Sequence, residues 1–570
     1  MRLLLAVLAI LLGAAALVLG IGQRTFWSPP ETATATLASP LEDAPLTVIE
    51  PGVAGVHPDA VDVTIEGDGE FLVALGRSED VDAWVGDAAH NTITGVDTIQ
   101  GQLFAEHTKG GAEVPNPAGS DLWVDSETAD GELVHKWTEP AQGDWSLLLA
   151  ADGKSPAPTS VTVSWPNDAG TPFAIPLIIA GSLLLVLGLA LTVVAGRGRG
   201  GRGAKGTSPA PATAPLGHVG SAPASGGVVK RGAAVAVAAV LAMGSATPAI
   251  AAGAAVPNSP SSSSDSATAE PADGESGPPA VLLDVQLERI LASVSEAVSA
   301  ADSAKDAKKL ADRVTHQAHQ LRETNYDQRA DGLKVPAPAA VAEGPLLSAA
   351  VTTSTEWPRT VVAVTKAEKA TVPQVLTLTQ ADPRSNYKLV SSVSMLPGSE
   401  FPGIAVGDPA VTTLPTDAKD LRHTPEVAAA RLAGYLSDPS SKAKDSFADS
   451  VFITATHEGQ DDVAQANEDA SIEYSRKVAK DRTTAVSTPD GGAIVTAYLT
   501  STMTAQPKED GGTVALDDLS AELAGASTTQ ERVDISYAEP VVFYIPAGGS
   551  KEKIRLVAGD VLLMSAKVAD

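Results

Sequence analysis

The chain has 570 residues, a formal net charge of −29 and no cysteine, and only 4% of its residues are aromatic. This length allows about two to four domains. The missing cysteines exclude disulfides, thiolate metal sites, cysteine nucleophiles and a lipid-modified N-terminal cysteine. The negative charge opposes binding to phosphate backbones, so we expect no nucleic acid partner.

An apolar run from Leu3 to Gly20 follows Arg2 at the start of the chain. A cleaved signal peptide has an apolar region of about 7–15 residues and a small-x-small cleavage site. This run is longer and ends in GIGQRTFW, which lacks such a site. We therefore expect residues 1–22 to form a transmembrane helix that anchors the chain. A cleaved signal peptide is the alternative, and both export the segment that follows.

Residues 30–168 contain short runs of alternating apolar and polar residues, separated by Gly, Pro, Asp and Asn clusters. This pattern predicts an extracytoplasmic all-β sandwich. The runs are 32–37, 45–50, 61–67, 70–76, 121–125, 133–138, 145–151 and 160–165. One short helix is expected over 78–89, with Ser78 or Asp80 as its N-cap. Four tryptophans are expected to pack mostly in the core, namely Trp84, Trp123, Trp137 and Trp145.

The charge of the chain is concentrated in this region. Between Glu31 and Asp168 there are 25 acidic and four basic residues, so 21 of the 29 net negative charges lie here. We interpret this excess as the solvated surface of an exported protein. It is also compatible with a basic partner or with Ca²⁺.

A second apolar segment, 173–195, carries no charge, and 14 of its residues are Leu, Ile, Val or Phe. Its length matches a hydrocarbon core of about 30 Å, so we expect a transmembrane helix. Arg197, Arg199, Arg202 and Lys205 follow directly. Basic residues beside a span stay in the cytoplasm, which places the preceding domain outside. Residues 196–232 form a basic, Gly- and Pro-rich linker that we expect to be disordered and cytoplasmic.

A third apolar segment, 233–252, follows Lys230 and Arg231 and ends near Ala249-Ile250-Ala251. Basic flank, apolar stretch and Ala-x-Ala site are the three parts of a secretory signal peptide, here in the middle of the chain. Two outcomes stay open: a retained third transmembrane helix, or cleavage after Ala251. Both put the rest of the chain outside the cytoplasm, after a second disordered linker at 253–279.

The remaining sequence alternates between helical and strand patterns. Helical spacing between Leu282 and Val298, extended to Leu321, precedes strand runs at 359–366, 373–380 and 387–396. Thr424 and Pro425 predict a helix start, followed by helices to Leu436 and over 440–449. Further strand runs are 450–457, 493–504, 532–546 and 552–566. This order predicts two α+β units with antiparallel sheets, 280–410 and 424–570.

These blocks, together with Leu321-Arg322-Glu323 and Asn325-Tyr326, resemble NTF2-like or cystatin-like domains. The resemblance implies helices packed on a curled sheet that encloses a cone-shaped pocket. The stretch GRSEDVDAWVGDAAH at 76–90 resembles membrane-anchored actinobacterial envelope proteins that carry no known chemistry. This second resemblance therefore implies a location and no activity.

Two groups of side chains are candidates for a metal site. Asp80 and Asp82 lie on the short helix of the first domain, and carboxylate pairs hold hard cations. His316 and His319 are spaced i, i+3 on a helix. Capping by Asp80, and a solvated helix face for the histidines, explain the same residues without a metal. No motif indicates a catalytic residue or a cofactor, so neither is expected.

We therefore expect a non-catalytic, multi-pass protein of the cell membrane. Its expected partners are the lipid bilayer and, for the extracytoplasmic domains, other envelope proteins or a cell-wall component. One alternative is an accessory or sensory subunit that binds a small molecule or cell-wall fragment in an NTF2-like pocket. A hydrolase of envelope polymers is the other alternative, and it requires polar groups that converge in a cleft.

Overall fold

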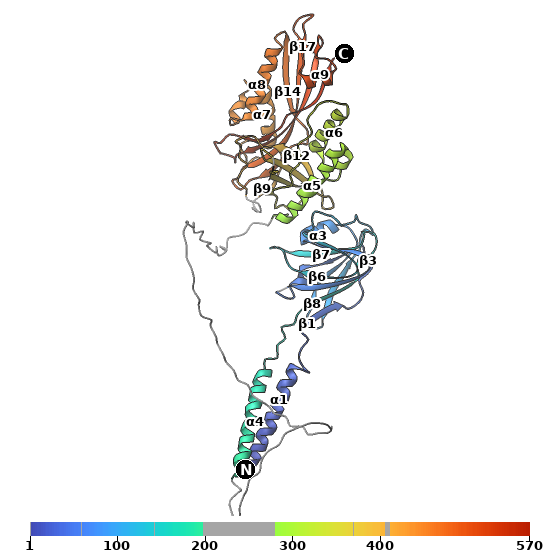
Figure 1. Ribbon diagram of the computed structural model, residues 1–570, viewed down its shortest axis with the longest axis vertical. Helices are drawn as coiled ribbons and strands as arrows, with labels where there is room; N and C mark the ends of the chain where they lie inside the picture. Colours follow the sequence, from blue (N-terminus) through green and yellow to red (C-terminus); the bar gives the residue numbers. More distant parts are fainter. Residues whose placement is uncertain are drawn as a thin grey trace, which may run out of the picture. The chain divides into compact units, whose positions relative to one another are not determined.

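The computed structural model describes residues 2–197 except 59 and 142, and residues 280–569 except 369 and 405–410. The predicted linkers beyond Arg197 and the third apolar segment 233–252 lie outside the described residues. The described chain divides into two compact units. One is a pair of helices, and the other comprises the two folded regions, residues 29–170 and the C-terminal region (Figure 1).

The first unit contains α1 (Arg2–Arg24) and α4 (Ala174–Arg197), which lie side by side (Figure 1). Both are long and apolar enough to cross a membrane. Glycines let the two backbones approach closely, because a Cβ added to Gly13 would lie 2.8 Å from the carbonyl oxygen of Gly181. Gly188 packs against Ile10 in the same way, so the helices run antiparallel. Both predicted apolar helices are thus confirmed as helices.

The region between these helices is a closed β-barrel. Its strands are β1 (Thr32–Leu37), β2 (Leu46–Ile49), β3 (Val61–Arg77), β4 (His90–Asp97), β5 (Gln102–Thr108), β6 (Asp125–Trp137), β7 (Trp145–Ala150) and β8 (Ser160–Pro166). Two short helices, α2 (Pro51–Ala54) and α3 (Ser78–Val85), interrupt them. The ring order is β3-β7-β2-β4-β5-β1-β8 and back to β3, and β6 pairs with β3 alone. The pairs β1–β5 and β2–β4 are parallel, so the barrel is mixed.

The predicted sandwich is therefore wrong, and the long strand β3 is the reason. Two short runs, 61–67 and 70–76, are one strand with a bulge between Glu66 and Glu70. Its first half pairs with β8 and its second half with β7, which closes the ring. Alternation shows which side of a strand is buried, but sandwiches and barrels share that pattern. The run 121–125 is a loop leading into β6.

The barrel core confirms the expectation for the tryptophans. Trp137 and Trp145 are buried inside the ring, whereas Trp84 and Trp123 pack with α3 on its outer side. All four are at most 2% exposed. The prediction of Ser78 or Asp80 as the N-cap of this helix is wrong. Arg77 is the N-cap residue of α3, and its side chain makes no capping hydrogen bond. The Ser78 hydroxyl instead bonds to the hydroxyl of Ser146, at 2.7 Å.

The C-terminal region is α+β with antiparallel sheets, as predicted. One sheet has the order β12-β11-β10-β9, and the other contains β13-β15-β16-β19-β20 with β14 and β21 attached. The strands are β9 (Leu346–Val351), β10 (Arg359–Thr365), β11 (Gln374–Gln380), β12 (Lys388–Ser394), β13 (Thr413–Leu414), β14 (Ala470–Val478), β15 (Thr484–Ser487), β16 (Ala493–Pro507), β19 (Val533–Ile545), β20 (Arg555–Gly559) and β21 (Leu562–Val568). A separate ribbon pairs β17 (Val514–Ala515) with β18 (Thr528–Thr529).

Its helices are α5 (Asp284–Ala304), α6 (His316–Ala330), α7 (Pro425–Ser437), α8 (Val451–Ala466) and α9 (Asp518–Ala524), with 3₁₀ turns η1 (Ala307–Leu310) and η2 (Lys442–Ser446). Thr424 caps α7 as predicted, and its hydroxyl accepts a hydrogen bond from the backbone N–H of Val427. The predicted strand 450–457 is wrong, because this segment begins α8. In place of the helix expected over 440–449 the structure has only the 3₁₀ turn η2. The helical segment expected to continue to Leu321 is not continuous, because α5 ends at Ala304.

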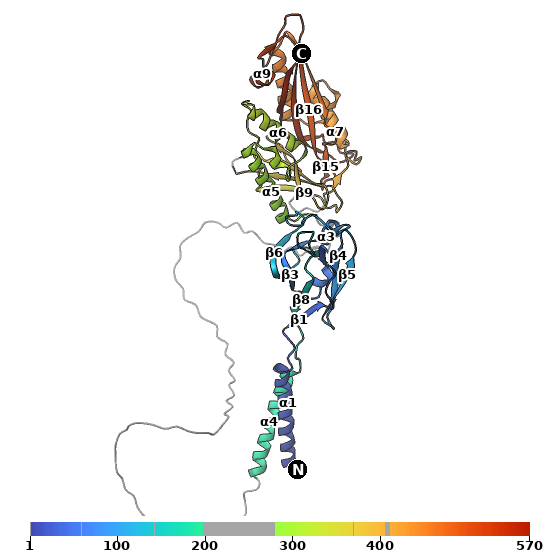
Figure 2. The ribbon, with the colours of Figure 1, turned by 90° about the vertical axis from the view of Figure 1, so that its right-hand side faces the viewer.

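The two sheets pack face to face and have helices on their outer sides. Val361 of β10 belongs to the core under α5, whereas its neighbour Val362 belongs to a second core with Ile494 of β16. The next residue of β16, Val495, packs on the other side of its sheet with Leu432 of α7. Figure 2 shows α6 and α7 on opposite sides of the strands. The predicted units 280–410 and 424–570 thus share the core between the two sheets. Together they form one C-terminal domain of four layers, in the order helices, sheet, sheet, helices.

Candidate functional site

The barrel and the C-terminal domain meet in an interface centred on α3 and the loop 117–124. Arg359 of β10 donates from Nη2 to Oδ1 of Asp80, at 2.6 Å. The Arg359 side chain is fully buried and that of Asp80 is 2% exposed. The guanidinium also lies 3.9 Å from the ring centre of Trp357. Burial raises the pKa of the Asp80 carboxyl, and the positive charge of Arg359 acts against this shift.

A second carboxylate of the barrel, Asp121, has partners from two connecting segments of the C-terminal domain, one before α6 and one before β12. Its Oδ2 accepts hydrogen bonds from Nη1 of Arg313, at 2.6 Å, and from the backbone N–H of Tyr387, at 2.8 Å. The side-chain amide of Gln286 donates to the backbone carbonyls of Asp121 and Leu122. Because Asp121 is also buried, these bonds replace the water that it loses.

A further arginine of the C-terminal domain binds the C-terminal end of α3. Arg384 donates from Nε to the carbonyl of Trp84 and from Nη2 to that of Val85, both at 2.8 Å. These are C-terminal carbonyls of the helix, where orphan acceptors and the negative end of the dipole favour a cation. Arg289 donates to the carbonyls of Trp123 and Val124. We name this set of contacts the arginine interface.

The arginine interface explains part of the charge excess that the sequence shows. The barrel region has 21 more acidic than basic residues, and the C-terminal domain presents four arginines to it. Within the chain itself, these four arginines supply the positive charge that meets the barrel. The sequence offers no signal for this pairing, because the arginines are scattered among ordinary helix and strand runs.

The four metal candidates do not come together. Asp80 is paired with Arg359 in the interface, while Asp82 is exposed on α3. His316 begins α6, and burial together with the charge of Arg482 lowers its pKa. His319 lies 3.8 Å from Glu323, one helical turn along. Within residues 2–197 and 280–569, as far as these are described, no group of three or more potential ligands is placed to hold a metal ion.

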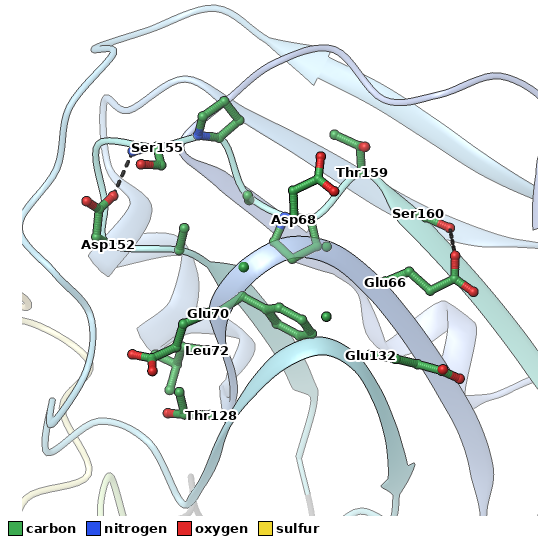
Figure 3. A pocket seen from close by; sticks show the side chains of 18 of the residues that line it. Glu66, Asp68, Glu70, Leu72, Thr128, Glu132, Asp152, Ser155, Thr159 and Ser160 are labelled. Carbon is green, nitrogen blue, oxygen red and sulfur yellow. Dashed lines mark hydrogen bonds between the residues drawn. The ribbon is translucent and has the colours of Figure 1, made fainter.

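The barrel carries an acidic groove of about 960 Å³ beside the bulge of β3. Figure 3 shows carboxylates around it, from Glu66, Asp68, Glu70, Glu132 and Asp152. Backbone N–H groups of Ser155 and Lys154 lower the pKa of Asp152. Three of these carboxylates lie on β3, and the other two on β6 and the segment after β7. The groove is polar and acidic, so its chemistry favours a cationic partner over an apolar ligand.

The C-terminal domain has a second candidate, a smaller and mostly apolar surface pocket, which we name the α8 pocket. It has a volume of about 310 Å³ and lies between α8 and strands β14, β16 and β19. Its lining is Phe452, Ala455, Thr456, Gly459, Gln460, Val463, Tyr474, Arg476, Ser501, Met503, Tyr537, Glu539 and Val561. The lining is mostly apolar and contains one carboxylate and no histidine.

The single carboxylate of the α8 pocket is neutralised. Arg476 donates from Nε to both oxygens of Glu539, at 3.0 and 2.8 Å, and from Nη1 to the carbonyl of Leu436. Both side chains are at most 5% exposed. Burial raises the pKa of Tyr474 to about 12, so its hydroxyl stays protonated. The lining of the pocket is therefore mostly apolar and carries no net charge, which suits an apolar ligand.

Comparison with known families matches residues 280–567 to one family model, described as a domain of unknown function, DUF8094. The matched range covers the four-layered domain from α5 to β21 and includes the α8 pocket. No curated protein and no solved structure matches the chain.

Proposed function

Since the chain belongs to the DUF8094 family, and its family domain contains the α8 pocket, we propose that it is a membrane-anchored binding protein of the cell envelope. It acts without catalysis, as an accessory or sensory subunit that holds an apolar ligand. The α8 pocket carries this proposal, because its volume is at the lower end of the range for small-molecule sites.

The position of the pocket also supports the resemblance to NTF2-like and cystatin-like domains. A helix, α8, lies over a face of an antiparallel sheet, and the space between them is the pocket. This arrangement, within the second predicted unit, supports the cone-shaped pocket that the resemblance implies. A hydrolase requires converging polar groups, and the lining supplies one carboxylate already bound to arginine.

We propose further that both folded regions lie outside the cytoplasm. The arginine interface supports this location, because a domain packed on the barrel lies on the barrel's side of the membrane. If α1 and α4 both span, the chain after Arg197 is on the opposite side from the barrel. It then has to cross once more before α5, and the apolar composition of 233–252 suits that crossing.

Binding in the α8 pocket can be tested with a matched pair of glycine variants. Gly459 on α8 lines the pocket, whereas Gly434 on α7 does not, and a Cβ at either position meets nothing within 4 Å. Leucine in place of Gly459 fills the pocket without straining the helix. The probe is N-phenyl-1-naphthylamine, titrated into the full chain in lipid nanodiscs, with empty nanodiscs subtracted.

We expect saturable binding that G459L weakens by about tenfold or more and that G434L leaves unchanged, because only the first substitution removes apolar space. Equal binding by both variants and the parent would show that the α8 pocket does not hold the probe.

A further inference from the structure

A second cavity of about 510 Å³ adjoins the α8 pocket. It lies among α6, α9, β12, β21 and the loop 335–339, and we name it the β21 cavity. Two residues, Tyr537 of β19 and Val561 of the turn before β21, line both spaces. Val561 is a large apolar residue that is 52% exposed. The two cavities are therefore neighbours with a common wall of two side chains.

The chemistry of the two cavities differs. The β21 cavity has polar groups along its lining, which include Arg322, Asn325, Ser392, Ser394, Asp517 and Asp560. Oδ1 of Asn325 is buried and has no hydrogen-bond partner. Oδ2 of Asp560 accepts a hydrogen bond from the backbone N–H of Ser394, at 3.0 Å. Acceptors with spare capacity favour a ligand that brings hydroxyl donors.

The charges of the β21 cavity restrict the ligand further. Asp517 and Asp560 are carboxylates, and the one cation in the lining, Arg322, already lies 3.3 Å from Asp302 and donates to the carbonyl of Ala339. A phosphate or carboxylate placed here meets two like charges without a free cation to offset them. A neutral head group avoids this repulsion.

We propose that the α8 pocket and the β21 cavity form one elongated site for a neutral, hydroxyl-bearing amphiphile of the acylglycerol class. The acyl chain occupies the α8 pocket, and the hydroxyl-bearing head lies in the β21 cavity, with Tyr537 and Val561 between them. This inference rests on the proposed function, because it names the ligand class for the α8 pocket.

Two photoreactive monoacylglycerols test the orientation of the ligand. One carries a diazirine at the end of its acyl chain and the other carries it beside the glycerol. Each is added to the full chain in nanodiscs, and the labelled peptides are identified by mass spectrometry. We expect the tail probe to label residues 452–463, and the head probe to label residues 321–328 or 517–520.

A second pair of variants separates this inference from the proposed function. Thr324 on α6 lines the β21 cavity, and its neighbour Glu323 is exposed and does not. T324W should lower monoacylglycerol labelling at least fivefold and leave N-phenyl-1-naphthylamine binding intact, whereas E323W should change neither. G459L should lower both.

If T324W has no effect on monoacylglycerol labelling while G459L abolishes it, the α8 pocket binds alone and the elongated site is wrong. Stronger labelling by an anionic lysophosphatidate analogue would overturn the neutral head group. If G459L alters neither probe, the proposed function itself fails.

Discussion

At the scale of single residues, the pair Asp80 and Arg359 determines how two folded regions become one body. Both side chains are buried, and each is the other's counter-ion. A buried pair contributes little compared with apolar residues of the same volume, but removal of one partner leaves an uncompensated charge. We therefore expect the pair to favour one specific alignment of the barrel with β10.

Replacement of Arg359 by methionine should destabilise the protein by about 3–5 kcal/mol, because the buried Asp80 carboxyl loses its counter-ion and is left either ionised without a partner or protonated. The measurement is the thermal midpoint of the full chain in detergent. R532M is the control, since Arg532 pairs with Asp534 on the surface and such pairs contribute about 0–1 kcal/mol. If D80L combined with R359M is not more stable than R359M alone, the ion pair does not explain the loss.

Asp80 also illustrates which residue roles could not be predicted from the sequence. Its place after a strand and at a helix start made it a candidate cap or metal ligand. Its partner Arg359 is far away in the chain, so the ion pair becomes visible only in three dimensions. The burial of the four tryptophans was predictable, because large aromatic side chains are usually buried whichever fold the chain adopts.

At the scale of elements, the sequence predicted the helix ends and strands that depend on neighbouring residues. Thr424 with Pro425 located the start of α7, and alternation located most strands. The start of α8 was missed because Val451, Phe452 and Ile453 are residues that favour strands. In the structure Ser450 caps this segment, and Phe452 and Ile453 are buried, so packing outweighs propensity. The α8 pocket depends on this helix and was therefore not locatable in advance.

Close packing of α1 on α4 leads to an element-scale prediction. In G181L the new Cβ would lie 2.8 Å from the carbonyl oxygen of Gly13, so the helices have to separate. Spin labels on R2C and R197C should then show a longer and broader distance distribution by pulsed electron resonance. L183A is the control, because Leu183 is 66% exposed. An unchanged distribution in G181L would mean that the glycines do not set the packing.

At the scale of the whole molecule, the sequence predicted the order of regions but not their association. The two predicted α+β units share a core between their sheets, and the family model spans both. The barrel closes through pairings between strands that are distant in the chain. Such long-range contacts leave no periodic signal, which is why the sandwich, the separate units and the free barrel surface were all predicted instead.

Whether the barrel and the C-terminal domain share one side of the membrane is tested most directly by labelling single cysteines with a membrane-impermeant maleimide. The chain has no cysteine, so each introduced thiol reports alone. Asp68 is exposed on the barrel, Lys551 is exposed on the C-terminal domain, and Ser208 follows the basic run after α4. In intact spheroplasts D68C and K551C should react, and S208C should react only after lysis. If K551C is protected until lysis while D68C reacts, the two regions lie on opposite sides and the arginine interface does not form in the cell.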